Sequence, residues 1–325
     1  MFVLFDTVCS VPRKSIHRHL LSILCASVAL LSRPSGFAED EARASNVVVN
    51  AESDEGEHDQ FTEMGEYGQP AWAERNRASS TTSVYVLSPY EAFLGLNWEG
   101  SFHRHGKSLH DLTQEIDVGL LHRLELGFEN ELGLVGSHAY ETSATLEARY
   151  ALANWNAIPL NPAVSVEYTF GIGKSVSSAR LRDRRHRNLR EQSDAVSLRL
   201  LFGQAFADNR IGYGLNIGMQ QDLTNDSGRT LTISQSASYG FGKGEFELGA
   251  EMRYTHSTSQ SAAGSEDEFI IGPTFSWKPT RQTRIGCAPL FGCTQDSPIV
   301  ATVVLFSYEF GGAEAIVPAA AQRER

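Results

Sequence analysis

The stretch EAFLGLNWEGSF, Glu91 to Phe102, alternates between two sets of side chains. One set is apolar and contains Ala92, Leu94, Leu96, Trp98, Gly100 and Phe102. The other set is mostly polar or small and contains Glu91, Phe93, Gly95, Asn97, Glu99 and Ser101. Because side chains point to opposite faces of a strand at a period of two, the stretch predicts a β-strand with one apolar and one polar face.

The same alternation recurs along the chain and predicts about twelve strands of roughly ten residues, the length that a tilted strand needs to cross a bilayer. After the first run, the apolar faces begin at Ile116, Leu124, Ala144, Val164, Val196, Ile211, Leu231, Phe246, Phe269, Ile285 and Val300. An even number of strands suits a closed antiparallel barrel. We therefore predict an all-β protein, an antiparallel transmembrane β-barrel that follows a disordered N-terminal extension.

The connections between these strands fall into two kinds. One set is short, apart from Ala151 to Pro162, and the other is longer. Short periplasmic turns with longer external loops indicate an outer-membrane barrel. A soluble β-sandwich also alternates in this way, but here the apolar faces carry almost no charge and the opposite faces are polar and glycine-rich. The short connections are Leu121 to Arg123, Gln204 to Arg210, Phe241 to Lys243 and Pro279 to Gln282, and the longer loops lie around Gly106, Gly136, Leu181, Asn225, Ala262 and Thr294.

The chain begins with features of an export signal. A basic region precedes the apolar run LLSILCASVALL, Leu20 to Leu31, and small residues at Gly36 and Ala38 predict cleavage after Ala38. The segment that follows is acidic and poor in aromatic residues near its start, so we expect disorder. The predicted organisation is a signal peptide at 1–38, an acidic periplasmic extension at 39–80, an outer-membrane barrel at 81–312 and a tail at 313–325.

The final run VATVVLFSYEF, Val300 to Phe310, resembles the closing strand of bacterial outer-membrane proteins, with aromatic residues at Phe306, Tyr308 and Phe310. The tail after Phe310 departs from that pattern, since in many of these proteins the chain stops at the aromatic residue. More broadly, Trp72 to Phe310 resembles a family of uncharacterised, transporter-like outer-membrane barrels. The resemblance implies contact with outer-membrane lipid, lipopolysaccharide and the barrel assembly machinery, and it supplies no catalytic motif.

Acidic residues outnumber basic ones on the predicted inner faces. Unpaired charges are costly to bury dry, so the lumen either holds water or contains ion-pair networks. Excess carboxylates favour cations or neutral solutes over anions, and the net charge of −11 argues against nucleic acid as a partner. The function predicted is a passive pore or transporter for small solutes, and the alternative is a structural or adhesive barrel with a closed lumen. The candidate translocation residues are Glu99, Glu115, Asp117, Glu129, Glu147, Arg149, Glu167, Arg199, Glu247, Glu251 and Arg253.

Other polar clusters suggest weaker hypotheses. An arginine-rich external loop could contact lipopolysaccharide phosphates or an anionic ligand, or could be a solvated loop; its arginines are Arg180, Arg182, Arg184, Arg185 and Arg187. His103, His105 and His110 could bind a transition metal, but solvated histidines explain the cluster more simply. No metal or cofactor is predicted.

Two cysteines remain after removal of the signal peptide, Cys287 and Cys293, and their close spacing in an oxidising compartment predicts a local disulfide. A barrel hydrolase is a further alternative, because His256 is in the outward phase of its strand, but Ser257 and Ser259 are not, and we expect no enzyme. The stretch VEYTFGIGKS, Val166 to Ser175, has Tyr168 where a phosphate-binding loop needs glycine, so it is interpreted as the end of a barrel strand.

Overall fold

The computed structural model describes residue 61 and residues 64–75, 84–104, 108–135, 138–175, 190–223, 228–259 and 264–311. All of these belong to one compact unit, Asp59–Arg325. The predicted signal peptide, residues 39–60 of the extension, the arginines of the basic loop and the tail at 313–325 lie outside the described residues. Among the residues described, no helix is long and apolar enough to cross a membrane.

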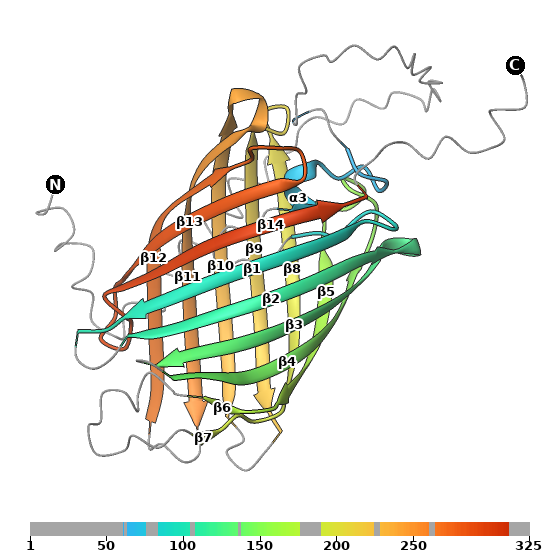
Figure 1. The fold of residues 1–325 in the computed structure, drawn as a ribbon. Helices are drawn as coiled ribbons and strands as arrows, with labels where there is room; N and C mark the ends of the chain where they lie inside the picture. The colour runs from blue at the N-terminus through green and yellow to red at the C-terminus, as the bar shows by residue number, and fades with distance from the viewer. Residues whose placement is uncertain are drawn as a thin grey trace, which may run out of the picture. The chain divides into compact units, whose positions relative to one another are not determined.

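Twelve antiparallel strands close into a barrel in the order β1-β14-β13-β12-β11-β10-β9-β8-β5-β4-β3-β2 (Figure 1). The first strand pairs with the last along its whole length, from Ala92 opposite Phe310 to Phe102 opposite Val300. This arrangement confirms the predicted fold class. The barrel strands are β1 (Ala92–Phe102), β2 (Leu109–Leu120), β3 (Leu124–Val135), β4 (His138–Ala151), β5 (Ala163–Gly171), β8 (Ala195–Phe206), β9 (Ile211–Asp222), β10 (Arg229–Phe241), β11 (Phe246–Ser259), β12 (Gly264–Trp277), β13 (Thr283–Gly292) and β14 (Val300–Phe310), while β6 (Lys174–Ser175) and β7 (Arg190–Glu191) form a separate small sheet.

The outer face of the barrel is apolar, as the alternation predicts. Leu94, Phe128, Leu198 and Leu248 are 40–53% exposed although they are large hydrophobic residues. Polar residues at the intervening positions point inward and are largely buried, including Glu115, which is 4% exposed. A closed barrel leaves no unpaired strand edge and is one of the two structures that can satisfy the backbone within lipid.

Tight connections gather at one end of the barrel, which we call the turn end; the opposite end is the loop end. The 3₁₀ turns η1 (Leu121–Arg123) and η2 (Gly242–Gly244) join β2 to β3 and β10 to β11. Each reverses the chain through a residue with positive φ, His122 at 63° and Lys243 at 58°. Both turns were predicted from the sequence, because only a few residues separate the strands on either side.

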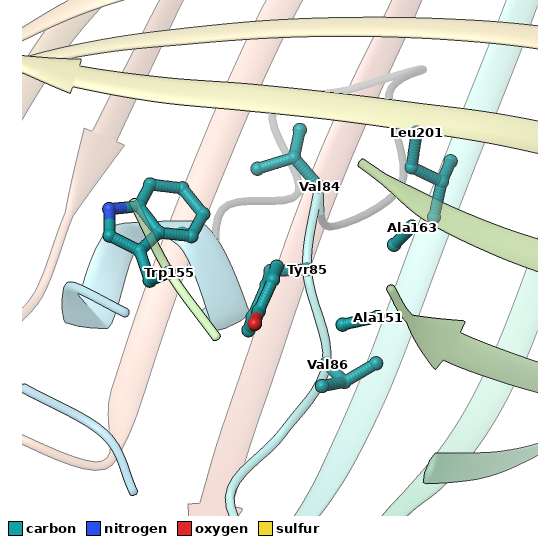
Figure 2. Packing of buried hydrophobic residues seen from close by; sticks show 8 residues of the cluster. Val84, Tyr85, Val86, Ala151, Trp155, Ala163 and Leu201 are labelled. Atoms are coloured by element: carbon teal, nitrogen blue, oxygen red, sulfur yellow. The ribbon is translucent and has the colours of Figure 1, made fainter. Parts of the chain in front are cut away.

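The segment that precedes β1 packs inside the barrel at the turn end. We call its described residues, 61, 64–75 and 84–90, the plug. It contains the short helix α3 (Ala71–Arg75) and the strap Val84–Leu87. Figure 2 shows Val84, Tyr85 and Val86 against residues of the barrel, and the buried cluster that they form also contains Ala73, Ala151, Trp155, Ala163 and Leu201.

The plug departs from the sequence expectation over residues 64–75, which were assigned to the disordered extension. The acidic composition of residues 39–66 dominated that interpretation. However, Tyr67 and Trp72 both pack against the buried cluster of the plug. Apolar surface of this kind offsets the entropy cost of ordering the segment, and the acidic run obscured it.

Inward glycines make room for the plug on the barrel wall. A Cβ atom at Gly203 would lie 2.4 Å from Cγ2 of Val84, and one at Gly214 would lie 2.9 Å from Cγ1 of the same residue. Two neighbouring strands, β8 and β9, therefore form a seat for Val84 that larger residues would fill.

The predicted disulfide is wrong, because both cysteines are free. Cys287 lies in the middle of β13 with its side chain on the exposed outer face, and Cys293 follows the end of that strand. Six residues of extended chain span about 20 Å, whereas the Cα atoms of a disulfide lie about 4.4–6.8 Å apart. The prediction rested on the close spacing of the two cysteines in the sequence and did not take into account that an extended strand separates them in space.

Candidate functional site

A buried ion-pair cluster lies where the plug meets the wall. The Arg149 side chain is fully buried, and its Nη1 and Nη2 atoms lie 2.6 Å from Glu125 Oε1 and 2.8 Å from Glu147 Oε1. Glu125 stands directly opposite Arg149 on neighbouring strands, and the Ser165 hydroxyl donates a hydrogen bond to Glu147 Oε1 at 2.6 Å. The local alternation places all of these side chains on the inner face.

The same cluster holds the backbone of the plug. The amide of Leu87 donates to Glu125 Oε2 at 2.7 Å, and Arg149 Nη1 donates to the carbonyl of Tyr85 at 3.4 Å. Glu147 and Arg149 were predicted to line a translocation path, and the structure instead places them beneath the plug. Sequence reasoning missed this role because the strap that they hold is distant in sequence.

A cavity of about 330 Å³ lies inside the barrel. Four of the predicted translocation residues line it, namely Glu115, Glu129, Arg199 and Arg253. Most other lining side chains carry hydroxyl or amide groups. These are Asn97, Thr113, Ser197, Asn216, Gln220, Thr230, Thr232, Ser234 and Thr255.

Both arginines of the cavity are paired with carboxylates. Arg253 on β11 and Glu99 on β1 form a two-pronged ion pair, with N–O distances of 2.6 Å and 3.2 Å. Since three strands separate β11 from β1 in the barrel order, this pair bridges the lumen. Arg199 Nη1 lies 2.8 Å from Glu167 Oε1.

The remaining predicted lumen residues are buried in the wall or paired. Asp117 and Glu251 are 3% and 2% exposed, and Glu247 forms an ion pair with Arg284. Carboxylate oxygens of Glu115, Glu129 and Glu147 lie within 4.8 Å of one another. Acidic residues on adjacent strands produce such a group without any ion, so we assign no metal to it.

One side of the lumen is apolar, which the sequence analysis did not anticipate. Ile270, Ala288, Leu290 and Ala301 form a buried inward-facing cluster on β12, β13 and β14. Val303 and Leu305 continue it along β14, at 1% and 4% exposed. The sequence VATVVLF, Val300 to Phe306, indicates this apolar inner face, because both alternating sets of side chains in it are largely apolar. The prediction considered only the outward set, which contains the aromatic residues.

The hypotheses for histidines and arginines on the outer face and near the loop end have different outcomes. His256 is on the outer face as predicted, and its Nδ1 lies 2.7 Å from Asp267 Oδ1, which also accepts a hydrogen bond from Tyr254 at 2.8 Å. His110 stacks on Trp98 with ring centroids 5.6 Å apart, a packing role rather than a ligand role. His105 and the arginines of the basic loop, Arg180, Arg182, Arg184, Arg185 and Arg187, lie outside the described residues.

The chain is similar in fold to solved outer-membrane barrels. The COG4313 outer membrane channel from Pseudomonas putida F1 matches with a TM-score of 0.52 and 14% identity, over 71% of this chain and 100% of that one. A KdgM porin matches with a TM-score of 0.41 and 15% identity, over 67% of this chain and 99% of that one. LpxR from Salmonella typhimurium matches with a TM-score of 0.44 and 10% identity, over 66% and 99% of the two chains. No protein-family model and no curated protein matches the chain.

Proposed function

We propose that the protein is an outer-membrane channel for small polar solutes, closed at its turn end by the plug in the state described. The observation that carries the proposal is the cavity of about 330 Å³, lined by hydroxyl and amide groups inside a closed barrel with an apolar outer face. A lumen that served only as a packed core would be filled by side chains, as small barrels are. Outer-membrane lipid, lipopolysaccharide and the assembly machinery are the partners that this location implies.

The charge of the cavity favours neutral solutes and cations over anions within this proposal. Glu115 and Glu129 line it beside Arg199 and Arg253. Those two arginines are paired with further carboxylates, Glu167 and Glu99, so acidic groups outnumber basic ones around the cavity. Much of the acidic excess counted from the sequence belongs to other contacts, such as the ion pair of Glu125 with Arg149 beneath the plug. The acidic groups that remain around the cavity still favour neutral solutes and cations over anions.

Swelling of proteoliposomes tests this proposal. A variant that lacks residues 59–87 should admit small neutral polyols and organic cations faster than organic anions of the same size, because carboxylates around a pore repel anions. Vesicles without protein provide the baseline, and a variant that lacks residues 39–56 serves as a control for shortening the chain. Swelling no faster than the baseline with every solute would contradict a pore.

A second candidate function, a structural or adhesive barrel with a closed lumen, is favoured by the buried plug and the ion pairs beneath it. Arg149 is fully buried between two carboxylates, which is an arrangement suited to permanent closure. The two candidates differ in the variant without residues 59–87, since a purely structural barrel retains no selective pathway when the plug is removed.

A further inference from the structure

Two prolines face each other in neighbouring strands of the wall. Ile271 pairs with Phe291 and Phe275 pairs with Cys287 in the same register, which places Pro273 on β12 opposite Pro289 on β13. The three residue pairs between these positions are not formed, so the ladder is interrupted there and resumes beyond. We call this interruption the proline seam.

The interruption removes two backbone hydrogen bonds. The amide of Cys293 donates to the carbonyl of Phe269 at 2.8 Å, and bonded pairs alternate along antiparallel strands. Hydrogen-bonded pairs recur at every second residue from that pair. Pro273 and Pro289 therefore occupy a position where the two opposite residues normally exchange two N–H···O hydrogen bonds. Neither has an N–H group to donate. Within sheets, proline is normally confined to edges, first residues and bulges, and a closed barrel has no edge.

The seam is closed by close approach of the two backbones. A Cβ atom at Gly272 would lie 2.0 Å from the carbonyl oxygen of Pro289 and 2.9 Å from Cα of Leu290. The backbone of β13 therefore lies over the inner face of Gly272, and only glycine leaves space for it.

Apolar surface borders the seam on both sides. On the luminal side, Ile270, Ala288 and Leu290 are at most 2% exposed, and on the outer side Ile271 and Phe275 are 37% and 42% exposed. Elsewhere the residues around the cavity are mostly polar, and other apolar residues of the inner wall, such as Leu201, pack against the plug.

An apolar track connects the cavity to the seam. Leu305 lines the cavity, and the pairing of β13 with β14 places Val303 opposite Ala288 and Ala301 opposite Leu290. Leu290 in turn lies over Gly272 at the seam. The track runs along the inner face of β14 and β13. The seat of the plug at Gly203 and Gly214 lies on other strands, β8 and β9.

We propose that the proline seam is a lateral exit, through which an uncharged small molecule with an apolar part passes between the cavity and the bilayer. The proposal rests on the proposed function only in that the solute enters the cavity. Separation of β12 from β13 is easiest here, because two ladder bonds are already missing, whereas breaking an intact ladder in lipid leaves further backbone groups unsatisfied. The side chains of the track are buried in the state described, so the path opens only as β12 and β13 separate, and it then presents an apolar surface that matches the bilayer interior.

A reversible cross-link tests the exit. In the full chain with Cys287→Ser and Cys293→Ser, the pair Ile271→Cys and Phe291→Cys places two thiols directly opposite each other at the edge of the seam and keeps both prolines. The separation of about 5.5 Å between Cα atoms of such a pair is one that a disulfide accepts. Ala237→Cys with Ala250→Cys, directly opposite on the intact β10–β11 ladder, is the matched control. The readout is entry of N-phenyl-1-naphthylamine, an uncharged dye that fluoresces in lipid, into intact cells whose outer membrane contains each variant.

Oxidation of the seam pair should reduce dye entry to the level of cells without the protein, and reduction should restore it, while oxidation of the control pair changes nothing. A Pro273→Ala and Pro289→Ala variant, which regains both N–H donors, should also slow dye entry. Dye entry that is equal in the oxidised and reduced seam variants would overturn the exit. Polyol swelling of the variant lacking residues 59–87 is measured separately, so its failure would count against the channel and not against the seam.

Discussion

Replacement of Arg149 by methionine is expected to lower the free energy of unfolding by about 3–5 kcal/mol, the cost of leaving a buried ion pair without one partner. The arginine is fully buried and bonded to Glu125 and Glu147, which are 2% and 5% exposed. Methionine has a similar reach and no charge, so the carboxylates lose their cation without a large change in packing. Urea unfolding of the refolded barrel in detergent, followed by the mobility of the folded form on gels, measures the change.

Arg199→Met is the matched control for this prediction. Its side chain is 33% exposed and forms an ion pair with one carboxylate, Glu167, which is 5% exposed. The loss should therefore be smaller than for Arg149→Met, because one buried carboxylate rather than two loses its cation and solvent reaches the site. Adding Glu125→Gln and Glu147→Gln to Arg149→Met should recover most of the lost stability, because neutral amides are less costly to bury than unpaired carboxylates. Equal losses for Arg149→Met and Arg199→Met would contradict the role assigned to the buried cluster.

Filling the seat of Val84 is expected to release the plug. Gly203→Val with Gly214→Val places side chains where Val84 now lies, since a Cβ atom at these positions would be 2.4 Å and 2.9 Å from its methyl groups. Burial of a valine side chain contributes about 1.5–3 kcal/mol, and the displaced strap also loses the bond from Leu87 to Glu125. The plug should become a substrate for trypsin, which cleaves after arginine, in a barrel that otherwise resists digestion.

Gly218→Val is the control for this second prediction. Gly218 is also an inward glycine of β9, but its nearest neighbour is the Arg199 side chain at 3.2 Å, so a valine there should narrow the cavity and leave the plug seated. If the double variant at Gly203 and Gly214 protects the plug as well as the parent protein does, the plug does not depend on this seat.

Much of the barrel could be predicted from the sequence, because lipid imposes a pattern that local residues carry. Leu94, Leu96 and Trp98 alternate with polar positions whatever the rest of the chain does, and the outward phase of β1 and of the closing strand follows from that. Tight turns such as Leu121–Arg123 were visible for the same reason. The structure confirms the strand count and the closure of β1 on β14.

The contents of the lumen could not be predicted in the same way. Whether Arg149 lines a water-filled path or holds a plug depends on Tyr85 and Leu87, and no local pattern connects residues so distant in sequence. The error at Cys287 has a different cause, because the disulfide was predicted from spacing in the sequence although Cys287 lies within a predicted strand that carries the chain away from Cys293. The proline seam depends on the register of β12 and β13, which puts Pro273 opposite Pro289, and the alternation of side chains alone does not give that register.

A solute-conducting lumen that the plug closes at the turn end should open when the plug is removed. Single-channel recording in planar bilayers compares the mature chain with the variant lacking residues 59–87, and the variant lacking residues 39–56 is the control. The mature chain and the control should be nearly silent, while the variant without the plug should show steady open-channel currents that favour cations over anions. Equal currents from all three proteins, or a silent barrel after removal of the plug, would contradict this prediction.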